Sequence, residues 1–351
     1  MTVRSDTVVD ARVCDPRVDG APDGWSEFAC TAGPHAVWEP ELLRIEGWLT
    51  RNPPLLVTVH DTDGIVVALS ALVCRPTRTP RYAPRRARRG PMWAEVAQPW
   101  LSGLPGVVRR PGVSGDHLRV AVRSAERALA RRLGAGLAGL FYRGVGSDLL
   151  PELIGRGRIH RRTDPSAVLD NTFSSVDEWL ASLSKSRRAG LRRQHRRAEA
   201  DPALVVRGGP GRTDIDAAAV AGLLNDHRAR FPTPAGDTRS PIAAPYVEAF
   251  VRRPDVHTLT YHDTDGRLLA LNTLLDHHDV VVKQHWAALP PEEGGRQGLY
   301  FDAYVRAVRW CIAHGRPRIS SGRGKLDVKT SLGFTPRDVH GVIAPRPVMG
   351  R

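Results

Sequence analysis

Apolar residues in this 351-residue chain follow strand-like and helix-like spacings in an order that occurs twice. Residues 58–72 read TVHDTDGIVVALSAL and residues 260–274 read TYHDTDGRLLALNTL, so nine of fifteen positions agree at a constant offset of 202. Each copy has an apolar run, an Asp-Gly turn and a second apolar run. This pattern predicts a β-hairpin in each copy, with Gly64 and Gly266 at positive φ.

The segments around the two hairpins repeat as well. ELLRIEGWL, from Glu41, and AAAVAGLLNDHRARF, from Ala217, predict a helix before each hairpin. Residues 117–146 and 298–324 each predict a long helix, ending at Gly134 and Gly315, and then a strand. The order helix, hairpin, long helix, strand predicts an α+β fold, in which two tandem units each pack helices on a mostly antiparallel mixed sheet.

A basic segment lies between the two copies. Residues 174–202 read SSVDEWLASLSKSRRAGLRRQHRRAEADP, where Ser175 and Glu178 have the spacing of a capping box and Asp201-Pro202 is a helix stop. The sequence therefore predicts an N-terminal unit over 1–165, a basic linking helix over 166–202, and a C-terminal unit over 203–351 that carries the active site.

Positive charge is concentrated in two stretches that contain no acid, within a net charge of +14. Such stretches favour a phosphate-rich partner, either a nucleic acid or a cofactor with several phosphates, although a solvated arginine-rich surface fits them equally. The first comprises Arg75, Arg78, Arg81, Arg85, Arg86, Arg88 and Arg89. The second comprises Lys185, Arg187, Arg188, Arg192, Arg193, Arg196 and Arg197.

Lysine is rare in this chain, with four among 51 basic residues: Lys185, Lys283, Lys325 and Lys329. A lysine in such a background can mark a place that needs a compact ammonium rather than a planar guanidinium. Four scattered cysteines without metal-ligand spacing, a first segment with early acids and no apolar core, and the absence of a long apolar run predict a soluble, cytoplasmic protein without a membrane span.

Three features resemble the Fem-like branch of the GNAT superfamily, in which two GNAT units are joined in one chain. They are the basic helix SLSKSRRAGLRRQHRR, the hairpin HDTDGRLLALNTLL and the terminal SSGRGKLDVKTSLGF, which together cover about residues 170–335. The resemblance implies a GNAT-type N-acyltransferase with aminoacyl-tRNA as the donor substrate and no tightly bound cofactor. The seven cations of the second basic stretch would then bind tRNA.

In GNAT proteins the phosphates of the donor lie where a strand opens into a helix, because free N–H groups and the positive helix end attract anions. The matching residues here are Gly294, Gly295, Arg296 and Gly298, with Lys325 in support. The usual acetyl-CoA pattern is not matched, and Glu292 and Glu293 precede the loop, so CoA is the alternative donor. A Gly-rich turn without a ligand also fits the segment.

The terminal motif supplies the candidate for catalysis. Lys329, followed by Gly333 and Phe334, matches the lysine and Gly-aromatic pair of Fem-type enzymes, which implies a role at substrate phosphate or at the tetrahedral oxyanion. A lysine extending from a surface strand is the competing interpretation. Direct transfer also needs a proton acceptor, and the candidates are His285 and Asp302, with Asp327 behind them.

Two further kinds of chemistry are not predicted. The adjacent His277 and His278 would point to opposite faces of a strand, so no metal site is expected. A serine elbow is absent, since there is no G-x-S-x-G.

Three functions remain in order of preference. The first is amide formation between an aminoacyl group from tRNA and an amine acceptor, either a small molecule or a peptidoglycan-type precursor. The second is acyl-CoA-dependent N-acylation, and the third is RNA binding without catalysis on a GNAT framework. The sequence does not define the acceptor, the amino acid or the oligomeric state.

Overall fold

The computed structural model describes residues 10–84, 90–98, 100–101, 103–231 and 240–351. The first nine residues therefore lie outside the described part, as do Arg85, Arg86, Arg88 and Arg89 of the first basic stretch. The chain divides into two compact units. Unit 1 comprises Met1–Asp164, Thr238–Ser240 and Asp338–Arg351, and unit 2 comprises Pro165–Asp237 and Pro241–Arg337.

Unit 1 is built on a mixed sheet whose strands run in the order β1, β2, β3, β4, β6 and β13, with β5 also pairing with β3. All of these pairs are antiparallel except β4–β6, which is parallel. The strands are β1 (Asp10–Cys14), β2 (Pro54–Asp61), β3 (Gly64–Cys74), β4 (Met92–Val96), β5 (Val107–Arg109), β6 (Leu137–Gly146) and β13 (Thr335–Pro345).

The helices of unit 1 are α1 (Trp25–Ala32), α2 (Pro40–Leu49), α3 (Gly115–Leu133) and α4 (Leu150–Leu153). Ser114 caps α3 by accepting a hydrogen bond from the backbone N–H of His117 at 3.2 Å. One side of α3 is apolar at helical spacing and packs into the core formed by β2, β3 and β6. Its buried residues include Leu118, Ala121, Val122, Ala125 and Leu129.

Unit 2 repeats this arrangement with strands in the order β7, β12, β11, β10, β9 and β8. The pair β11–β12 is parallel and the others with a described register are antiparallel. The strands are β7 (Ile159–Asp170), β8 (Val205–Pro210), β9 (Val256–His262), β10 (Leu268–Leu275), β11 (Val281–Ala288) and β12 (Arg318–Ser320).

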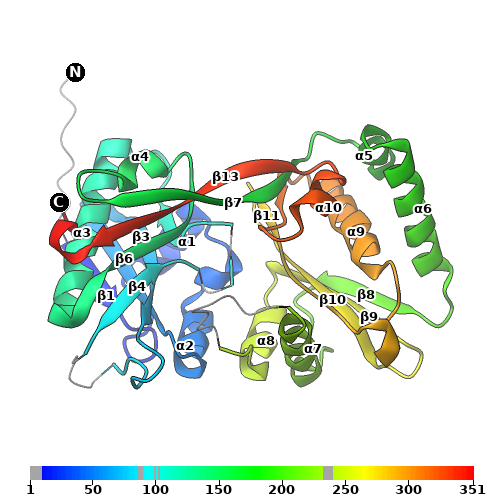
Figure 1. Ribbon diagram of the computed structural model, residues 1–351, viewed down its shortest axis with the longest axis horizontal. Helices are drawn as coiled ribbons and strands as arrows, with labels where there is room; N and C mark the ends of the chain where they lie inside the picture. Colours follow the sequence, from blue (N-terminus) through cyan, green and yellow to red (C-terminus); the bar gives the residue numbers. More distant parts are fainter. Residues whose placement is uncertain (1–9, 85–89, 99, 102, 232–239) are drawn as a thin grey trace. The chain divides into compact units, whose positions relative to one another are not determined.

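Helices cover both faces of the unit 2 sheet (Figure 1). One face packs against α9 (Leu299–Ala313), which in turn contacts α5 (Val176–Ser182) and α6 (Lys185–Ala200). The other face packs against α7 (Ala217–Ala229) and α8 (Ala244–Val251). A short helix, α10 (Leu326–Thr330), follows β12.

The predicted repeat is confirmed in both units. β2–β3 and β9–β10 are antiparallel hairpins, and their turn residues Gly64 and Gly266 have φ of 106° and 83°. The long helices end where the sequence predicted, at Gly134 (φ 72°) and just before Gly315 (φ 60°). A glycine at positive φ after the last helical turn lets the chain reverse without a Cβ clash.

The predicted basic helix is wrong in one respect, because it is two helices. The chain is extended at Leu183, and Ser184 starts α6 as a second N-cap by accepting from the N–H of Arg187 at 3.3 Å. The capping box is also altered. Ser175 accepts from the N–H of Glu178, whereas the Glu178 carboxylate accepts from Ser174.

The unit boundaries also differ from the expected ones. Residues 166–202 belong to unit 2, where β7 pairs with β12, rather than forming a separate linker. Residues 338–351 belong to unit 1, because β13 pairs with β6 there. Among the described residues, no helix has both the length and the apolar composition needed to cross a bilayer.

Candidate functional site

The parallel strands β11 and β12 of unit 2 separate soon after they meet. Val281 pairs with Ile319 and Val282 with Ser320, after which β11 continues to Ala288 beside β10 alone. Lys283 and Ser321 follow this last pair directly. Diverging strands leave backbone groups without partners in the ladder, and we call this point of divergence the opening between β11 and β12.

A β-bulge in β11 determines which side chains face the opening. Asn272 pairs with Trp286 and Leu274 with Lys283, so β11 has one residue more than β10 between these pairs. Directly opposed residues share a face of a sheet, and both Lys283 and Trp286 contact Tyr300 of α9. The bulge therefore places Lys283, Trp286 and Asn272 together on the α9 face.

His285 lies on the opposite face of the sheet. Its ring packs edge-on against Phe250 of α8, with ring centroids 5.8 Å apart, and burial lowers its pKa to about 4. Its backbone N–H donates to Thr273 Oγ1 at 3.1 Å. The structure thus does not bring His285 together with the lysines of the α9 face, and its role as a proton acceptor stays a prediction.

Lys283 is 6% exposed and its ammonium lies over three aromatic rings. Nζ is 4.5 Å from the ring centroid of Tyr304, 5.5 Å from that of Tyr300 and 5.3 Å from that of Trp286. Burial and the nearby Lys329 lower the pKa of Lys283 to about 7. The aromatic faces attract the charged form and oppose part of this shift.

Lys329, the predicted catalytic lysine, is 5% exposed in α10. Its ammonium donates to the carbonyl oxygen of Ser321 and, at 3.1 Å, to that of Gly322, at the end of β12. Burial, followed by repulsion from Lys325, lowers its pKa to about 8. An ammonium has three N–H bonds, so these two contacts fix its position and leave one donor for a ligand atom.

Lys325 stands at the N-cap of α10 with φ of 52°. It is the one non-glycine residue with positive φ in the described part of the chain. Its ammonium lies 5.5 Å from the ring centroid of Tyr300 and 5.7 Å from that of Phe231. A strained backbone at a cationic residue is typical of functional sites, so the strain adds to the case for this cluster.

Tyrosine and serine hydroxyls connect the lysines. Tyr304 and Ser321 are joined through Oη and Oγ at 2.5 Å, and the hydroxyls of Tyr300 and Tyr304 are 3.3 Å apart. Phe334 packs edge-on against Tyr304, with centroids 5.6 Å apart, and Gly333 has φ of 87°. The Gly-aromatic pair therefore supports the position of Tyr304. We call Lys283, Tyr300, Tyr304, Ser321, Lys325 and Lys329 the lysine cluster.

The predicted donor loop lies between β11 and α9. Gly294 and Gly298 have φ of 88° and 87°, and a Cβ on Gly295 would lie 2.0 Å from the carbonyl oxygen of Leu289, so the turn depends on glycine. Gly298 is the N-cap of α9 and has no side-chain capping bond. Arg296 is partly exposed, and its Nε is 3.8 Å from the Asp201 carboxylate.

Asp302, the second predicted proton acceptor, is fully buried in a network. Its carboxylate bonds to His195 Nδ1 and accepts from Tyr261 Oη and Arg306 Nε, both at 2.7 Å. Burial raises the pKa of Asp302, but these bonds and the charge of Arg306 outweigh it, so the net pKa is lowered. This geometry favours a role in positioning α6 and α9, because both oxygens already have partners.

The cations of α6 occupy different environments. Lys185, Arg192, Arg193, Arg196 and Arg197 are exposed, opposite the buried Leu191, His195 and Ala198. Arg187 and Arg188 are half-buried: the former lies 5.2 Å from the Phe301 ring centroid and the latter donates to the Ala181 carbonyl. Arg192 pairs with Asp177 at 2.8 Å, whereas no ion pair within the described chain joins Arg193, Arg196 or Arg197 to an acid.

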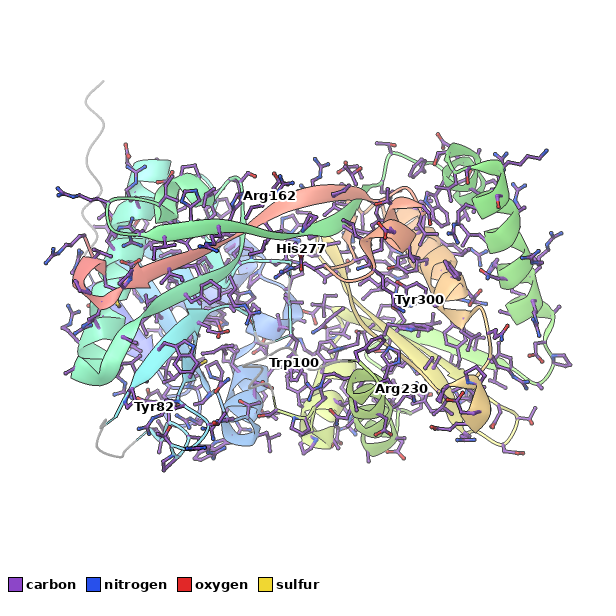
Figure 2. All side chains as sticks on the ribbon, viewed as in Figure 1. Tyr82, Trp100, Arg162, Arg230, His277 and Tyr300 are labelled. Atoms are coloured by element: carbon purple, nitrogen blue, oxygen red, sulfur yellow. The ribbon has the colours of Figure 1, made fainter. Side chains whose placement is uncertain are left out.

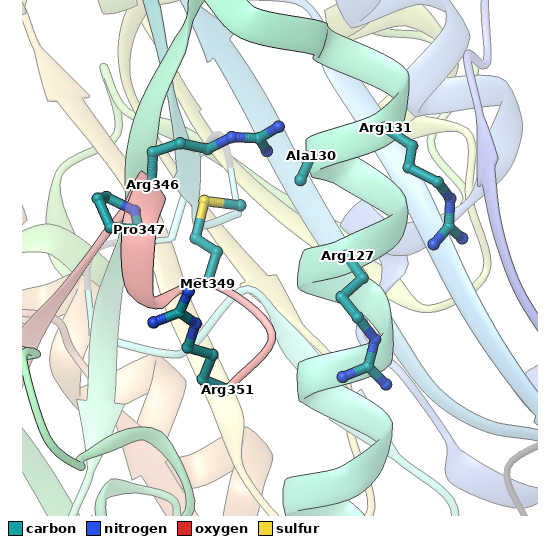
Figure 3. Close-up of a pocket in the computed structure, with 7 residues that line it drawn as sticks. All are labelled: Arg127, Ala130, Arg131, Arg346, Pro347, Met349 and Arg351. Atoms are coloured by element: carbon teal, nitrogen blue, oxygen red, sulfur yellow. The ribbon is translucent and has the colours of Figure 1, made fainter.

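Two surface cavities lie away from the lysine cluster. One, of about 490 Å³, lies in unit 1 between α3 and the last residues, and Figure 3 shows its arginines Arg127, Arg131, Arg346 and Arg351. The other, of about 440 Å³, lies in unit 2 beside the β9–β10 hairpin and mixes three aspartates with two arginines. Neither contains a residue of the lysine cluster.

The histidine pair also differs from expectation. His277 and His278 lie between β10 and β11 rather than within a strand, and their rings stack at a centroid distance of 4.3 Å. His277 Nδ1 accepts from the N–H groups of Asp279 and Val280. Among the residues that the structure describes, no group of three His, Cys, Asp or Glu side chains is arranged to hold a metal ion.

Sequence reasoning missed Lys283, Tyr304 and Asn272 as members of the site. The scarcity of lysine was the signal that could have found Lys283, because three of the four lysines lie in the cluster (Figure 2 labels Tyr300, which two of them contact). Tyr304 and Asn272 have the spacing of ordinary core residues, and nothing in the sequence distinguishes them.

Comparison with known proteins supports the fold. Residues 185–330 match the family model described as an acetyltransferase (GNAT) domain. L-PGS from Bacillus licheniformis has a TM-score of 0.57 at 10% identity, covering 94% of this chain and 98% of that one. FemX has a TM-score of 0.57 at 10% identity, covering 90% and 95%.

A third solved structure agrees with these two. The C-terminal domain of a putative lysylphosphatidylglycerol synthetase from Agrobacterium fabrum has a TM-score of 0.55 at 11% identity and covers 90% of both chains. No curated protein matches the sequence. At such identities the likeness concerns the fold.

Proposed function

We propose that this chain, which has a Fem-like tandem-GNAT fold and a GNAT acyltransferase domain over residues 185–330, joins an aminoacyl group from aminoacyl-tRNA to an amine acceptor. The observation that carries the proposal is the lysine cluster at the opening between β11 and β12, in the same unit as the exposed cationic face of α6. The first can serve an acyl transfer and the second can hold a polyanion.

The lysine cluster suits direct transfer. An amine nitrogen attacks the carbonyl carbon of the donor ester, a C–N bond forms, and negative charge develops on the carbonyl oxygen. The third N–H of Lys329 can meet this oxygen, since the Ser321 and Gly322 carbonyls hold the ammonium in place. A fixed donor in a partly dry site stabilises an oxyanion by several kcal/mol, about 10²–10³-fold in rate.

The face of α6 supports tRNA as the carrier of the donor. Arg193, Arg196 and Arg197 are exposed, and no acid within the described chain neutralises them. Lys185, Arg187 and Arg188 lie in the first turns of α6, where the helix dipole already attracts anions. Cations at the positive end of a helix repel one another and the helix dipole, so phosphate binding there is favourable.

An acyl-CoA donor is the second candidate, favoured by two observations. The family model that matches is described as an acetyltransferase, and Gly298 begins α9 after a strand in the position where phosphates can meet backbone N–H groups. Against it, the exposed Glu292 and Glu293 directly precede the loop and would repel a pyrophosphate.

The test is electrophoretic binding of the purified protein to bulk charged tRNA at low and moderate salt, with wild type beside Arg193→Ala/Arg196→Ala. We expect the double variant to bind more weakly and to lower the slope of log affinity against log salt by about 2, because each lost phosphate contact removes about one unit. Arg192→Ala should change affinity less, since Arg192 already pairs with Asp177.

The matched control is Arg156→Ala/Arg161→Ala, which removes the same charge from exposed arginines outside α6 that, like Arg193 and Arg196, form no ion pair with an acid in the described structure. If wild type does not bind tRNA at low salt, or if both double variants lose affinity equally, α6 is not a tRNA surface. Transfer from radiolabelled acetyl-CoA to a defined mixture of amino acids, amino sugars and polyamines then tests the second candidate.

A further inference from the structure

We propose that Lys283 is the proton acceptor of the transfer and that Asn272 positions the attacking amine beside it, an inference that rests on the acyltransferase function proposed above. The sequence suggested His285 and Asp302 for the proton. In the structure His285 lies on the other face of the sheet, and both carboxylate oxygens of Asp302 already form hydrogen bonds with other side chains.

The contacts of Lys283 and Asn272 carry the inference. Asn272 is 1% exposed, and its Oδ1 is buried with no hydrogen-bond partner in the described structure. The ammonium of Lys283 contacts three rings and no carboxylate in the described structure. Leu274 opposes Lys283 and Asn272 opposes Trp286, so Lys283 and Asn272 are neighbours on one face.

A primary amine fits these two groups. It has N–H bonds for Asn272 Oδ1 and a proton to lose, whereas a carbonyl or phosphate would offer Asn272 Oδ1 only another acceptor. A buried amide oxygen without a partner is destabilising, and a bound amine would supply the missing hydrogen bond. The unpaired oxygen therefore favours the acceptor amine over an anionic group at this position.

The charged groups around Lys283 determine whether it can accept a proton. Lys329 lies on α10. Lys325 stands at the start of the same helix, with its ammonium over the ring of Tyr300. Tyr300 and Tyr304 contact Lys283 from α9. Asp302, the acid of α9, is turned to His195 and Arg306. Burial and the ammonium of Lys329 favour the neutral amine, and the pKa of about 7 leaves a neutral fraction near physiological pH.

The amine nitrogen bonds to the carbonyl carbon while its N–H proton passes to neutral Lys283 Nζ, and Lys329 faces the carbonyl oxygen. The carbonyl reforms as the ester C–O bond breaks, and the proton moves from Lys283 to the leaving ribose oxygen. For a thioester donor the C–S bond breaks and the sulfur leaves instead. Lys283 ends the cycle neutral.

The kinetic test compares wild type, Lys283→Met and Lys283→Arg with bulk aminoacyl-tRNA and the defined amine mixture. We expect both variants to lose about 10²–10⁴-fold in kcat/KM, because arginine keeps the charge but does not become neutral. The ratio of wild-type to Lys283→Met rates should rise with pH and level off above about 7. The titration of the acceptor is common to both proteins and cancels in the ratio.

A second measurement does not depend on activity. Reductive methylation with ¹³C-formaldehyde labels four lysines in this chain, which Lys283→Arg, Lys325→Arg, Lys329→Arg and Lys185→Arg assign, and NMR then gives the pKa of each. We expect the Lys283 signal to titrate well below that of the exposed Lys185. A Lys283 signal in the ordinary lysine range overturns the inference.

The two proposals fail in different ways. If wild type transfers from neither aminoacyl-tRNA nor acetyl-CoA, the proposed function is wrong, whatever the titration gives. If wild type transfers and Lys283→Arg retains its rate, or the rate ratio does not change with pH, the function stands and Lys283 is not the proton acceptor.

Discussion

The two units share their order of elements but differ at their parallel strand pair. In unit 1, β4 pairs with β6 at four positions, from Met92 with Leu137 to Val96 with Tyr142. β5 then pairs with the part of β3 that β4 leaves free, at Val67–Leu69. In unit 2, β11 and β12 pair at two positions and separate, and β11 alone continues beside β10.

Close backbone contacts fill the corresponding part of unit 1. A Cβ on Gly144 of β6 would lie 2.3 Å from the Leu104 carbonyl oxygen, and one on Gly106 would lie 2.3 Å from the backbone nitrogen of Ala97. Unit 1 also contains no lysine, whereas unit 2 contains all four. The parallel pair of unit 1 is thus covered by close backbone contacts, whereas that of unit 2 diverges beside three lysines, so the two units differ where the proposed chemistry lies.

A buried carboxylate on the long helix is common to both units. Glu126 of α3 accepts from Tyr142 Oη at 2.7 Å and from Arg158 at 2.7 and 2.8 Å. Asp302 of α9 likewise accepts from a sheet tyrosine and an arginine. Because the same arrangement occurs in the unit without lysines, the comparison assigns it to the fold rather than to the chemistry.

The largest expected effect follows from this shared network. Glu126→Ala and Asp302→Ala should each destabilise their own unit by about 3–5 kcal/mol, since the first leaves the buried Arg158 without its carboxylate. The second removes the fully buried carboxylate that His195, Tyr261 and the half-buried Arg306 share. Hydrogen exchange should show the loss in α3 for the first variant and in α9 for the second. Both carboxyl pKa values are lowered, so this stabilisation is lost as pH falls through the folded-state pKa.

Asp302→Asn separates structure from catalysis, because the amide keeps the shape of the carboxylate. If Asp302 is structural, the rate per folded molecule should stay within about tenfold of wild type. A loss of about 10²–10⁴-fold in a protein that remains folded would make Asp302 a proton acceptor and remove the parallel with Glu126.

Lys329→Met should give the next largest effect. Methionine keeps the volume but removes the ammonium, so we expect kcat to fall about 10²–10³-fold through the lost oxyanion donor. The carbonyls of Ser321 and Gly322 lose their partner, which costs about 1–3 kcal/mol of stability. The assay is single-turnover transfer well below the Tm, with unfolding curves measured alongside.

Arg252→Met is the control for Lys329→Met, since it removes an exposed cation of unit 2 that pairs with Glu248 on α8. It should retain wild-type transfer. Wild-type turnover in Lys329→Met would show that the lysine cluster does not serve the reaction and that the open strand pair has another purpose.

The fold could be predicted because its signals are local. The Asp-Gly turns, the helix spacing and the glycines after the long helices each act within a few residues, and each was found in the structure. The break at Leu183-Ser184 was missed because serine is also a common helix residue. The pairing of β13 with β6 was missed because strand partners far apart in sequence leave no local signal.

The site was predictable only in part, for a similar reason. Lys329 was found by resemblance, and Lys325 by its proximity in sequence. His285 was assigned from its place on the strand before the donor loop, where the sequence cannot show the bulge opposite Thr273 or the packing of its ring against α8. Asp302 was assigned from its place at a helix start, where the sequence cannot show that His195, Tyr261 and Arg306 already contact it.

The smallest expected effect concerns the backbone of Lys325. Its φ of 52° is one that non-glycine residues adopt at a cost of about 1–2 kcal/mol, and the described part of unit 1 has no such residue. Lys325→Ala keeps this strain and Lys325→Gly relieves it, although glycine loses about 0.5–1 kcal/mol to its greater freedom when unfolded. We therefore expect the glycine variant to be more stable than the alanine variant by up to about 1 kcal/mol in urea unfolding.

Both variants lose the ammonium that lies over Tyr300, so their transfer rates should fall together. Equal stabilities would show that Lys325 is unstrained, whereas a rate lower in glycine alone would assign its role to the backbone conformation rather than to the charge.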